Sequence, residues 1–247
     1  MAEYKRPSSL MPMTTGYCPG CMHALATRLV ADVIDELQQS ENAINVVSVG
    51  CSALNLYSWC GDVIGSAHGR APAVATGIKR SLPDRLVFTY QGDGDLAAIG
   101  LAEIMSAANR GENFTVIFAN NQTYGMTGGQ MAPTTLIGQK STTTVFGRDA
   151  ATTGYPLKMC ELISVLEAPV FVARYALNTP KGVADAKRGI KKAFQLQLEG
   201  KGFTFIELLT NCPTNWGMNP LDTLDYMNTN TIPYFKPGIY KDTEADK

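Results

Sequence analysis

Two short polar motifs near the middle of the chain combine side chains that could bind a divalent cation. The motif GDGD (92–95) directly follows the apolar segment 86–90, and the motif NNQT (120–123) directly follows the apolar segment 114–119. Glycines permit a tight turn that brings backbone N–H groups close to a ligand. A carboxylate and an amide oxygen suit a hard cation such as Mg²⁺, which keeps part of its coordination shell for water and phosphates. These residue types therefore predict a site for Mg²⁺ and a diphosphate.

Four of the six cysteines lie where their sulfurs could meet at one metal centre. Cys18 and Cys21 flank a Pro-Gly turn before a helical segment, whereas Cys51 and Cys212 each follow an expected strand. Four thiolates are the number that a [4Fe-4S] cluster or a structural zinc ion requires. The 29 residues between Cys21 and Cys51 fit no zinc-ribbon or zinc-finger spacing, although the count alone leaves zinc open. A thioredoxin-like redox pair is disfavoured because residues 11–17 make a poor preceding strand.

An alternation of apolar strands and amphipathic helices positions these motifs. We expect strands at 44–49, 86–90, 114–119, 170–174 and 203–209, and helices at 23–38, 71–80, 96–109, 158–166 and 183–198. Strand-helix-strand units of this length are parallel and right-handed, and ligands bind at the carboxyl ends of their strands. The pattern predicts one α/β domain with a mostly parallel sheet flanked by helices.

His68 and Arg70 precede the expected helix 71–80. Because the N-terminus of a helix attracts anions, both side chains could contact a diphosphate. A capping or surface role fits the same positions equally well.

Three segments lack a helical or strand period. Residues 1–16 are expected to form an N-terminal arm, and the proline-containing residues 216–247 an extended C-terminal arm that packs on a neighbouring subunit. The glycine-rich loop 124–135 is expected to bind a ligand, and the unstructured residues 136–157 are a candidate lid. Residues 17–215 remain as the domain that carries both motifs and the cysteines.

Composition narrows the class of protein. The 247 residues are 45% hydrophobic and 17% charged, with a net charge of −1 and a pI near 6.1, which gives no electrostatic case for nucleic acid or an anionic membrane. No run of 18 apolar residues occurs, and the segment MAEYKRPSSLMP lacks the apolar core of a secretory signal. We therefore expect a cytoplasmic protein whose cysteines are reduced or bind metal.

The order of the motifs resembles that in β subunits of the 2-oxoacid:ferredoxin oxidoreductases. Gly-Asp-Gly followed after 25 residues by Asn-Asn is similar to the thiamine diphosphate motif of that enzyme superfamily. The chain adds CPGC, a Gly-Cys pair after a strand, the loop YGMTGGQ and a late Cys-Pro-Thr in the order found in these subunits. The resemblance covers residues 15–217 and identifies residues 17–215 as a thiamine diphosphate and iron–sulfur binding domain.

The resemblance implies three cofactors: thiamine diphosphate, Mg²⁺ and one [4Fe-4S] cluster. The side chains of Asp93 and Asn121 and the main-chain oxygen of Thr123 would hold Mg²⁺. The cluster ligands would be Cys18, Cys21, Cys51 and Cys212. The thiamine diphosphate would be lined by Cys51, Ser52, Ala53, Leu54, His68, Gly92, Gly94, Asp95, Gly125 and Met126. Cys60 and Cys160 match no ligand position, so we expect core thiols there.

The family pattern also indicates what this chain lacks. Some members carry a lysine where this chain has Gly128, so a substrate role of that lysine does not transfer. Thiamine diphosphate enzymes divide diphosphate binding and pyrimidine binding between two domains, and this chain is long enough for one. The nearest acidic residues, Glu103 and Glu112, are expected to be solvated. The glutamate that activates the pyrimidine is therefore expected from an α subunit, with small γ and ferredoxin-like δ subunits as further partners.

The activity implied is oxidative decarboxylation of a 2-oxoacid with coenzyme A to acyl-CoA, CO₂ and reduced ferredoxin. GDGDLAAIG and YGMTGGQMAPTT favour 2-oxoglutarate as the substrate, whereas a branched-chain 2-oxoacid such as 2-oxoisovalerate, or pyruvate, stays open. Arg70, Arg148 or a partner arginine are candidates to hold a distal carboxylate. Two alternatives remain: a non-redox thiamine diphosphate decarboxylase or carboligase needs no cysteine quartet, and a zinc-binding scaffold needs no thiamine.

Overall fold

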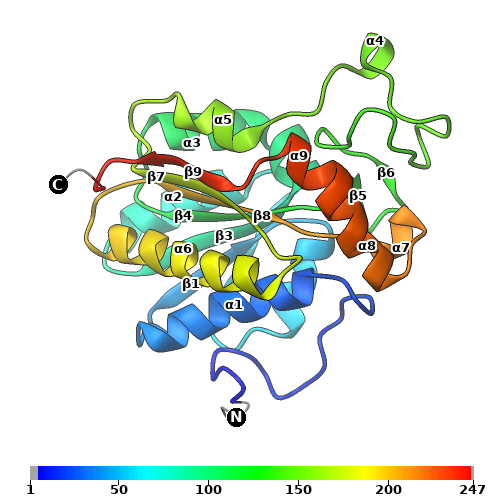
Figure 1. Cartoon of the computed structure of the whole chain (residues 1–247). Coiled ribbons are helices and arrows are strands. Elements are labelled where there is room, and N and C mark those ends of the chain that lie inside the picture. Colours follow the sequence, from blue (N-terminus) through cyan, green and yellow to red (C-terminus); the bar gives the residue numbers. More distant parts are fainter. Residues whose placement is uncertain (1–4, 246–247) are drawn as a thin grey trace.

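A seven-stranded sheet in the order β2-β1-β3-β4-β8-β7-β9 lies at the centre of the part that the computed structural model describes, residues 5–245 (Figure 1). Its strands are β1 (Ala43–Val47), β2 (Asp62–Gly65), β3 (Leu86–Gly92), β4 (Thr115–Asn120), β7 (Phe171–Ala176), β8 (Thr204–Leu209) and β9 (Gly238–Asp242). Neighbouring strands are parallel except β7 and β9, which are antiparallel. The predicted mostly parallel sheet is confirmed, while the edge strands β2 and β9 were not expected.

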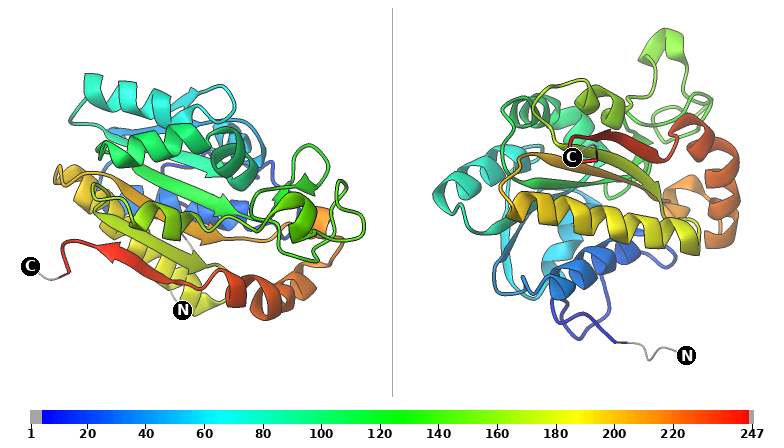
Figure 2. Two further views of the ribbon diagram at one scale, coloured as in Figure 1. Left: turned by 90° about the horizontal axis from the view of Figure 1, so that it is seen from above. Right: turned by 60° about the vertical axis from the view of Figure 1, so that its left-hand side comes forward.

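Helices cover both faces of the sheet, as the two views of Figure 2 show. One face carries α1 (His23–Glu36) and α6 (Pro180–Leu198), and the other carries α2 (Ala71–Ser81), α3 (Leu101–Asn109) and α5 (Met159–Ser164). Between residues 5 and 245, no helix combines the length and the apolar character that crossing a membrane requires.

The strands divide their side chains between two apolar cores. In β3, Leu86, Phe88 and Tyr90 pack with α1 and α6, whereas Val87 packs with α2 and α3. This alternation follows from the two-residue period of a strand. Because both faces are covered, the strand carries apolar side chains on both of them, which explains why such segments are readable in the sequence.

The segment after β3 is not the single α-helix expected over residues 96–109. Residues Gly94–Ile99 form a π-helical segment, and α3 begins only at Leu101. A β-carbon at Gly100 would lie 2.5 Å from the carbonyl oxygen of Gly69, so the close approach of the loop before α2 requires glycine. π-Helical turns of this kind are frequent at functional sites.

The prediction of an extended C-terminal arm is wrong. The segment forms α7 (Pro213–Trp216), α8 (Pro220–Tyr226), a π-helical turn (Met227–Thr231), α9 (Ile232–Tyr234) and strand β9. Its prolines 213 and 220 occupy first helical positions, where the missing N–H costs nothing. Met227 and Phe235 are fully buried in the core of this same chain, so the segment needs no neighbouring subunit for its order.

The predicted N-terminal arm is irregular but attached to the body. Residues 1–4 lie outside the described residues, as do residues 246–247 of the predicted C-terminal arm. The carboxylate of Asp35 accepts from the backbone N–H and the hydroxyl of Ser9, and Leu10 forms a β-bridge with Trp59. These contacts hold the segment against α1 and the segment before β2.

A long segment beyond β4 projects from the carboxyl ends of the strands (Figure 1, upper right). It begins with the antiparallel pair β5 (Thr123–Tyr124) and β6 (Gln130–Met131) and includes the short helix α4 (Ala150–Thr153). The sequence predicted the loop but not its internal structure.

Candidate functional site

A cavity of about 100 Å³ opens at the carboxyl ends of β1, β3 and β4. Residues predicted to bind cofactor or Mg²⁺ line it: Cys51, Ser52, His68, Gly92, Asp93, Gly94, Asp95, Asn121, Thr123, Gly125 and Met126. Ala53 and Leu54 follow on the same short 3₁₀ helix but are not among its lining residues. Parallel topology explains the convergence, because it brings the ends of neighbouring strands to one edge.

Asp93 follows the last residue of β3, and its carboxylate is almost fully buried, with 2% of the residue exposed. One oxygen accepts from the N–H of Gly94 at 2.8 Å, and the other accepts from the hydroxyl of Thr134 at 2.5 Å. Burial raises the pKa of Asp93 to about 6, although both hydrogen bonds act in the opposite direction. No basic side chain among residues 5–245 pairs with it, so a bound cation would stabilise the ionised form.

Asn121 and Thr123 present oxygen atoms beside Asp93. The side-chain oxygen of Asn121 accepts from the N–H of Thr123 at 3.2 Å, and its main-chain oxygen accepts from the indole N–H of Trp216 at 3.1 Å. Between them, Gln122 has a φ of 60°, a left-handed conformation that is unfavourable for a residue with a β-carbon. Such strain is typical of loops whose shape serves a site.

Ser52 adds an unsatisfied hydroxyl to the cavity wall. Its oxygen is buried and has no hydrogen-bond partner among the described residues. Buried polar atoms are nearly always paired, so this hydroxyl is available to a polar ligand.

Asp95 has a positioning role in the wall. Its carboxylate accepts from the hydroxyl of Ser48 at 2.8 Å, the N–H of Gly69 at 2.6 Å and the amide of Gln91 at 2.6 Å. It also accepts from Nδ1 of His68. Ser48, Gly69 and His68 all bond to Oδ1, whereas Gln91 bonds to Oδ2. Asp95 therefore fixes the loop before α2 and leaves Nε2 as the free ring nitrogen of His68.

Two of the four predicted cluster thiols meet over Gly125. A β-carbon at this glycine would lie 3.1 Å from the sulfur of Cys51 and 3.6 Å from that of Cys212. The amide of Asn215 donates to the sulfur of Cys212 at 3.3 Å and to the main-chain oxygen of Gly125 at 2.9 Å. Residues Cys51 and Cys212 are far apart in the sequence, so the sheet is what brings them together.

The CPGC turn completes this group of sulfurs. Burial raises the pKa of Cys21 to about 11, and the nearby thiols Cys212 and Cys18 raise it further. Burial likewise raises the pKa of Cys51 to about 12, with contributions from Cys21, Cys212 and Cys18. The four thiols thus lie near enough to influence one another electrostatically, and thiolates there would need bound metal for their charge.

This group does not have the spacing of a single-ion site. No set of three or more His, Cys, Asp and Glu side chains in the described part of the chain is positioned to hold one metal ion. An iron–sulfur cluster spreads its thiolates over several metal atoms, and the predicted Mg²⁺ ligands include only one carboxylate. As donor sets, four thiols match an iron–sulfur cluster, and a carboxylate with amide and main-chain oxygens matches Mg²⁺.

His23 is a site residue that the sequence reading missed. It follows the CPGC turn, lines the cavity, and is 1% exposed. Its Nδ1 lies 2.7 Å from the hydroxyl oxygen of Tyr90, and its ring stacks on Tyr17 with centroids 5.3 Å apart. Burial lowers the pKa of His23 to about 4, so the ring is neutral near pH 7. The signal in the sequence was its position two residues after Cys21.

Neither arginine suggested for a substrate carboxylate is free. Arg70 pairs with Glu103, so the expectation that Glu103 is simply solvated is also corrected. The guanidinium of Arg148 is buried and donates to five backbone carbonyls within the loop 133–155. Both side chains serve the structure of this chain.

Two further expectations from the sequence are wrong. Glu112 is buried rather than solvated, because Arg80 donates to it at 2.6 and 3.1 Å and Arg110 at 2.8 Å. Cys60 is exposed, whereas Cys160 is the core thiol that was predicted.

Comparison with known proteins agrees with this geometry. Residues 48–208 match the family model of the thiamine pyrophosphate enzyme C-terminal TPP-binding domain, where thiamine pyrophosphate is another name for thiamine diphosphate. The fold and the cavity thus define a domain of the thiamine diphosphate enzymes.

The relatives specify the family within that class. The chain is 37% identical over 224 residues to the 2-oxoglutarate synthase subunit KorB of Methanocaldococcus jannaschii, which covers 87% of this chain and 78% of KorB. It is 51% identical over 213 residues to the ketoisovalerate oxidoreductase subunit VorA of Methanothermobacter thermautotrophicus, covering 86% of this chain but only 44% of VorA. The chain belongs to the family of 2-oxoacid:ferredoxin oxidoreductase subunits, and it spans less than half the length of the VorA relatives.

A solved structure supports the same relationship. The 2-oxoglutarate:ferredoxin oxidoreductase from Magnetococcus marinus, solved with 2-oxoglutarate, coenzyme A and succinyl-CoA bound, superposes with a TM-score of 0.81 at 28% identity. The match covers 99% of this chain and 87% of that one, so the C-terminal helices and β9 are part of the shared fold.

Proposed function

We propose that this chain is the thiamine diphosphate-binding β-type subunit of a 2-oxoacid:ferredoxin oxidoreductase. In this reaction a 2-oxoacid loses CO₂, its acyl group passes to coenzyme A, and the electrons pass to ferredoxin. The observation that supports the proposal most directly is one cavity wall that contains Asp93, Asn121 and Cys51. Oxygen ligands for a metal-bound diphosphate and a thiol of the sulfur group lie side by side there.

The cation site is proposed to consist of Asp93, Asn121 and Thr123. The buried carboxylate of Asp93 lacks a cationic partner among residues 5–245, and hard oxygen ligands suit Mg²⁺. The unpartnered hydroxyl of Ser52 and the free Nε2 of His68 are available to the diphosphate. When bound, thiamine diphosphate supplies the carbanion chemistry, and these residues orient it.

The sulfur group is proposed to bind one [4Fe-4S] cluster through Cys18, Cys21, Cys51 and Cys212. Its position beside the cavity suits electron removal one electron at a time. The buried, neutral ring of His23 lines the cavity two residues after Cys21. All six cysteines are unpaired, which suits a reducing compartment such as the cytoplasm.

The active site is proposed to be completed by another chain. A volume of about 100 Å³ is well below the roughly 300–1,000 Å³ of typical ligand sites. Both carboxylates in the wall are already engaged, Asp93 by hydrogen bonds and Asp95 by four donors. An α subunit with the pyrimidine-binding domain is therefore proposed to supply the activating glutamate, with γ and ferredoxin-like δ subunits as further partners.

Within the 2-oxoacids, a branched-chain substrate is a second candidate beside 2-oxoglutarate. The 51% identity to a ketoisovalerate oxidoreductase subunit exceeds the 37% identity to a 2-oxoglutarate synthase subunit. The engagement of Arg70 and Arg148 within this chain also leaves neither free to bind a distal carboxylate. Initial rates with 2-oxoisovalerate, 2-oxoglutarate and pyruvate would rank the three substrates.

The function is tested on anaerobically purified complex. We expect iron, sulfide, magnesium and thiamine diphosphate in the protein, and reduction of ferredoxin or a viologen dye only when 2-oxoacid and coenzyme A are both present. Dye reduction without either substrate would refute the proposal. Thiamine diphosphate without iron would indicate a non-redox decarboxylase or carboligase, and zinc without iron or thiamine would indicate a scaffold.

A further inference from the structure

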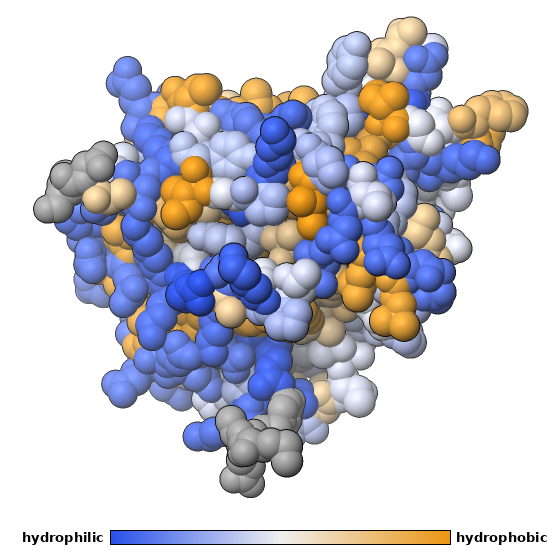
Figure 3. Space-filling model, in the orientation of Figure 1, coloured by the Kyte–Doolittle hydropathy of each residue, from blue (hydrophilic) through white to orange (hydrophobic). Residues whose placement is uncertain are grey.

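The surface next to the cofactor cavity is apolar and nearly uncharged. Residues 124–157 contain only Lys140, Arg148 and Asp149 as charged residues. Phe146 is 97% exposed and Val145 58% exposed at the outer end of this segment. Figure 3 shows hydrophobic side chains at the projecting upper right of the molecule. Depletion of charge with an exposed aromatic side chain is typical of the centre of a protein interface.

This segment has a fixed internal structure. The guanidinium of Arg148 ties together the carbonyls of both ends of the segment, at distances of 2.6 to 3.1 Å. A β-carbon at Gly147 would lie 2.6 Å from the carbonyl oxygen of Gly138, so the two arms of the segment touch. A segment that is already ordered loses little conformational entropy on docking.

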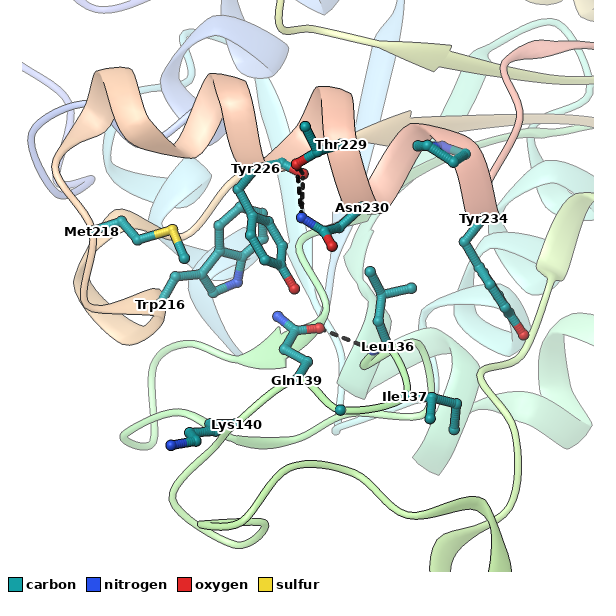
Figure 4. A pocket seen from close by; sticks show the side chains of 12 residues that line it. Leu136, Ile137, Gln139, Lys140, Trp216, Met218, Tyr226, Thr229, Asn230 and Tyr234 are labelled. Atoms are coloured by element: carbon teal, nitrogen blue, oxygen red, sulfur yellow. Dashed lines mark hydrogen bonds between the residues drawn. The ribbon is translucent and has the colours of Figure 1, made fainter.

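A groove of about 780 Å³ lies between the base of this segment and helices α7 to α9 (Figure 4). Trp216, Tyr226 and Tyr234 form one wall, and Leu136 and Ile137 belong to the other. The rings of Trp216 and Tyr226 are 5.1 Å apart. The groove can accommodate apolar side chains from another protein.

The wall that contains Leu136 and Ile137 is hydrogen-bonded to the proposed cation site. Just before Leu136, the hydroxyl of Thr134 donates to Asp93 at 2.5 Å. The hydroxyl of Thr135 donates to the main-chain oxygen of Gln122 at 2.6 Å. A shift of this wall would therefore move the proposed ligands.

The wall that contains Trp216 makes equivalent contacts from the other side. The indole of Trp216 donates to the main-chain oxygen of Asn121 at 3.1 Å, and the hydroxyl of Thr231 donates to the side chain of Gln122 at 3.2 Å. Both walls thus meet at the loop that presents Asn121 and Thr123.

We propose that the tip Val145–Phe146 and this groove dock the subunit that completes the thiamine diphosphate site, and that docking tightens cofactor binding through both walls. The inference rests on the proposed function. Met126 lines the cavity and is 48% exposed, so the rim of the cavity carries an exposed apolar side chain. A chain that closes the cavity must therefore cover the neighbouring apolar surface.

The occupant is defined by what the site lacks. It must bring apolar side chains for the groove and a free carboxylate for the pyrimidine. The cavity wall does not supply this carboxylate, because Asp93 and Asp95 are engaged there. The occupant is therefore the pyrimidine-binding subunit.

Docking is tested in the co-expressed complex with Phe146→Asp. The matched control is Val165→Asp. Val165 is 80% exposed and lies at the end of α5, before the start of β7. Native mass spectrometry should show loss of the pyrimidine-binding subunit for Phe146→Asp alone. Calorimetric titration with Mg²⁺ and thiamine diphosphate should show an affinity about tenfold or more weaker, a size usual for coupled sites.

Coupling is tested separately with Trp216→Phe, which keeps a ring in the groove but removes the N–H that reaches Asn121. This variant should keep the partner subunit and still bind thiamine diphosphate more weakly. Unchanged cofactor affinity would overturn the coupling. Circular dichroism of each variant, with Phe146→Ala as a milder change, separates lost docking from misfolding.

A photo-reactive phenylalanine analogue at position 146 identifies the occupant. Cross-links to the pyrimidine-binding subunit are expected. Cross-links to a second copy of this chain, or a Phe146→Asp complex with unchanged composition and affinity, would overturn the docking inference alone. A wild-type complex that binds no thiamine diphosphate would instead overturn the proposed function.

Discussion

The hydroxyl of Thr134 donates a 2.5 Å hydrogen bond to the carboxylate of Asp93, forty-one residues away in the sequence. This contact joins the loop after β6 to the end of β3. It also favours the ionised form of Asp93, which burial disfavours. Thr134 therefore supports the charge that a bound cation needs.

Replacing Thr134 with valine should weaken magnesium-dependent binding of thiamine diphosphate by about tenfold, because a hydrogen bond to a buried charge contributes roughly 1.5–3 kcal/mol. The pKa of Asp93 should rise, so the binding midpoint should move to higher pH. Calorimetric titrations between pH 5 and about pH 8 would measure both effects. The control is Thr152→Val on the exposed helix α4, and an unchanged affinity and pH midpoint in Thr134→Val would contradict the prediction.

The metal-free chain should lose stability as the pH rises from about 4 to about 6. The pKa of Asp93 is about 6 in the folded chain against an ordinary value of 3.8, so the folded state binds more protons in this window and stability falls with rising pH. The difference corresponds to at most about 3 kcal/mol. In Asp93→Asn, the free energy of unfolding measured in urea should not show this decrease between about pH 4 and about pH 6. The same variant should lose Mg²⁺-dependent cofactor binding. If the free energy of unfolding changed equally with pH in the parent and in Asp93→Asn, the prediction would be contradicted.

The positions of Asp93 and Asn121 could be predicted because topology alone determines them. Each follows an apolar parallel strand, and parallel strands end at one edge. The same reasoning applied to Cys51 and Cys212, whose sulfurs meet over Gly125. The positions of such residues can be predicted without knowledge of side-chain packing.

The C-terminal segment could not be predicted in the same way, because its helices are too short to show a period. Pro220, at the first position of α8, was misread as a sign of an extended chain. The role of Trp216 depends on the path of that segment, since its partner Asn121 lies 95 residues earlier. Likewise, Glu112 seemed solvated because Arg80 reaches it from another helix.

Substituting Asp95 with asparagine should destabilise the fold. In Asp95→Asn an NH₂ group replaces either Oδ1, the acceptor for Ser48, Gly69 and His68, or Oδ2, the acceptor for Gln91, so at least one buried donor loses its partner. Each unsatisfied donor costs about 1–3 kcal/mol. Thermal unfolding should show a lower midpoint, whereas Asp149→Asn, at the cap of the exposed helix α4, should change it little. A midpoint equal to that of the parent would show that Asp95 does not hold this wall together.

A substitution at Cys212 tests the sulfur group without changing a residue that lines the cofactor cavity. Cys212 accepts a hydrogen bond from Asn215 and lies against Gly125, but it does not line the cavity. Cys212→Ser should therefore lose most of the iron and the visible absorbance of the cluster but keep bound thiamine diphosphate. The matched control is Cys160→Ser, which alters a buried thiol outside the group and should keep both cofactors. Electron transfer to a viologen dye should fail only in Cys212→Ser, since the electrons then have no acceptor. Full iron content in that variant would show that the sulfur of Cys212 is not a ligand, and the four-thiol arrangement would have to be abandoned.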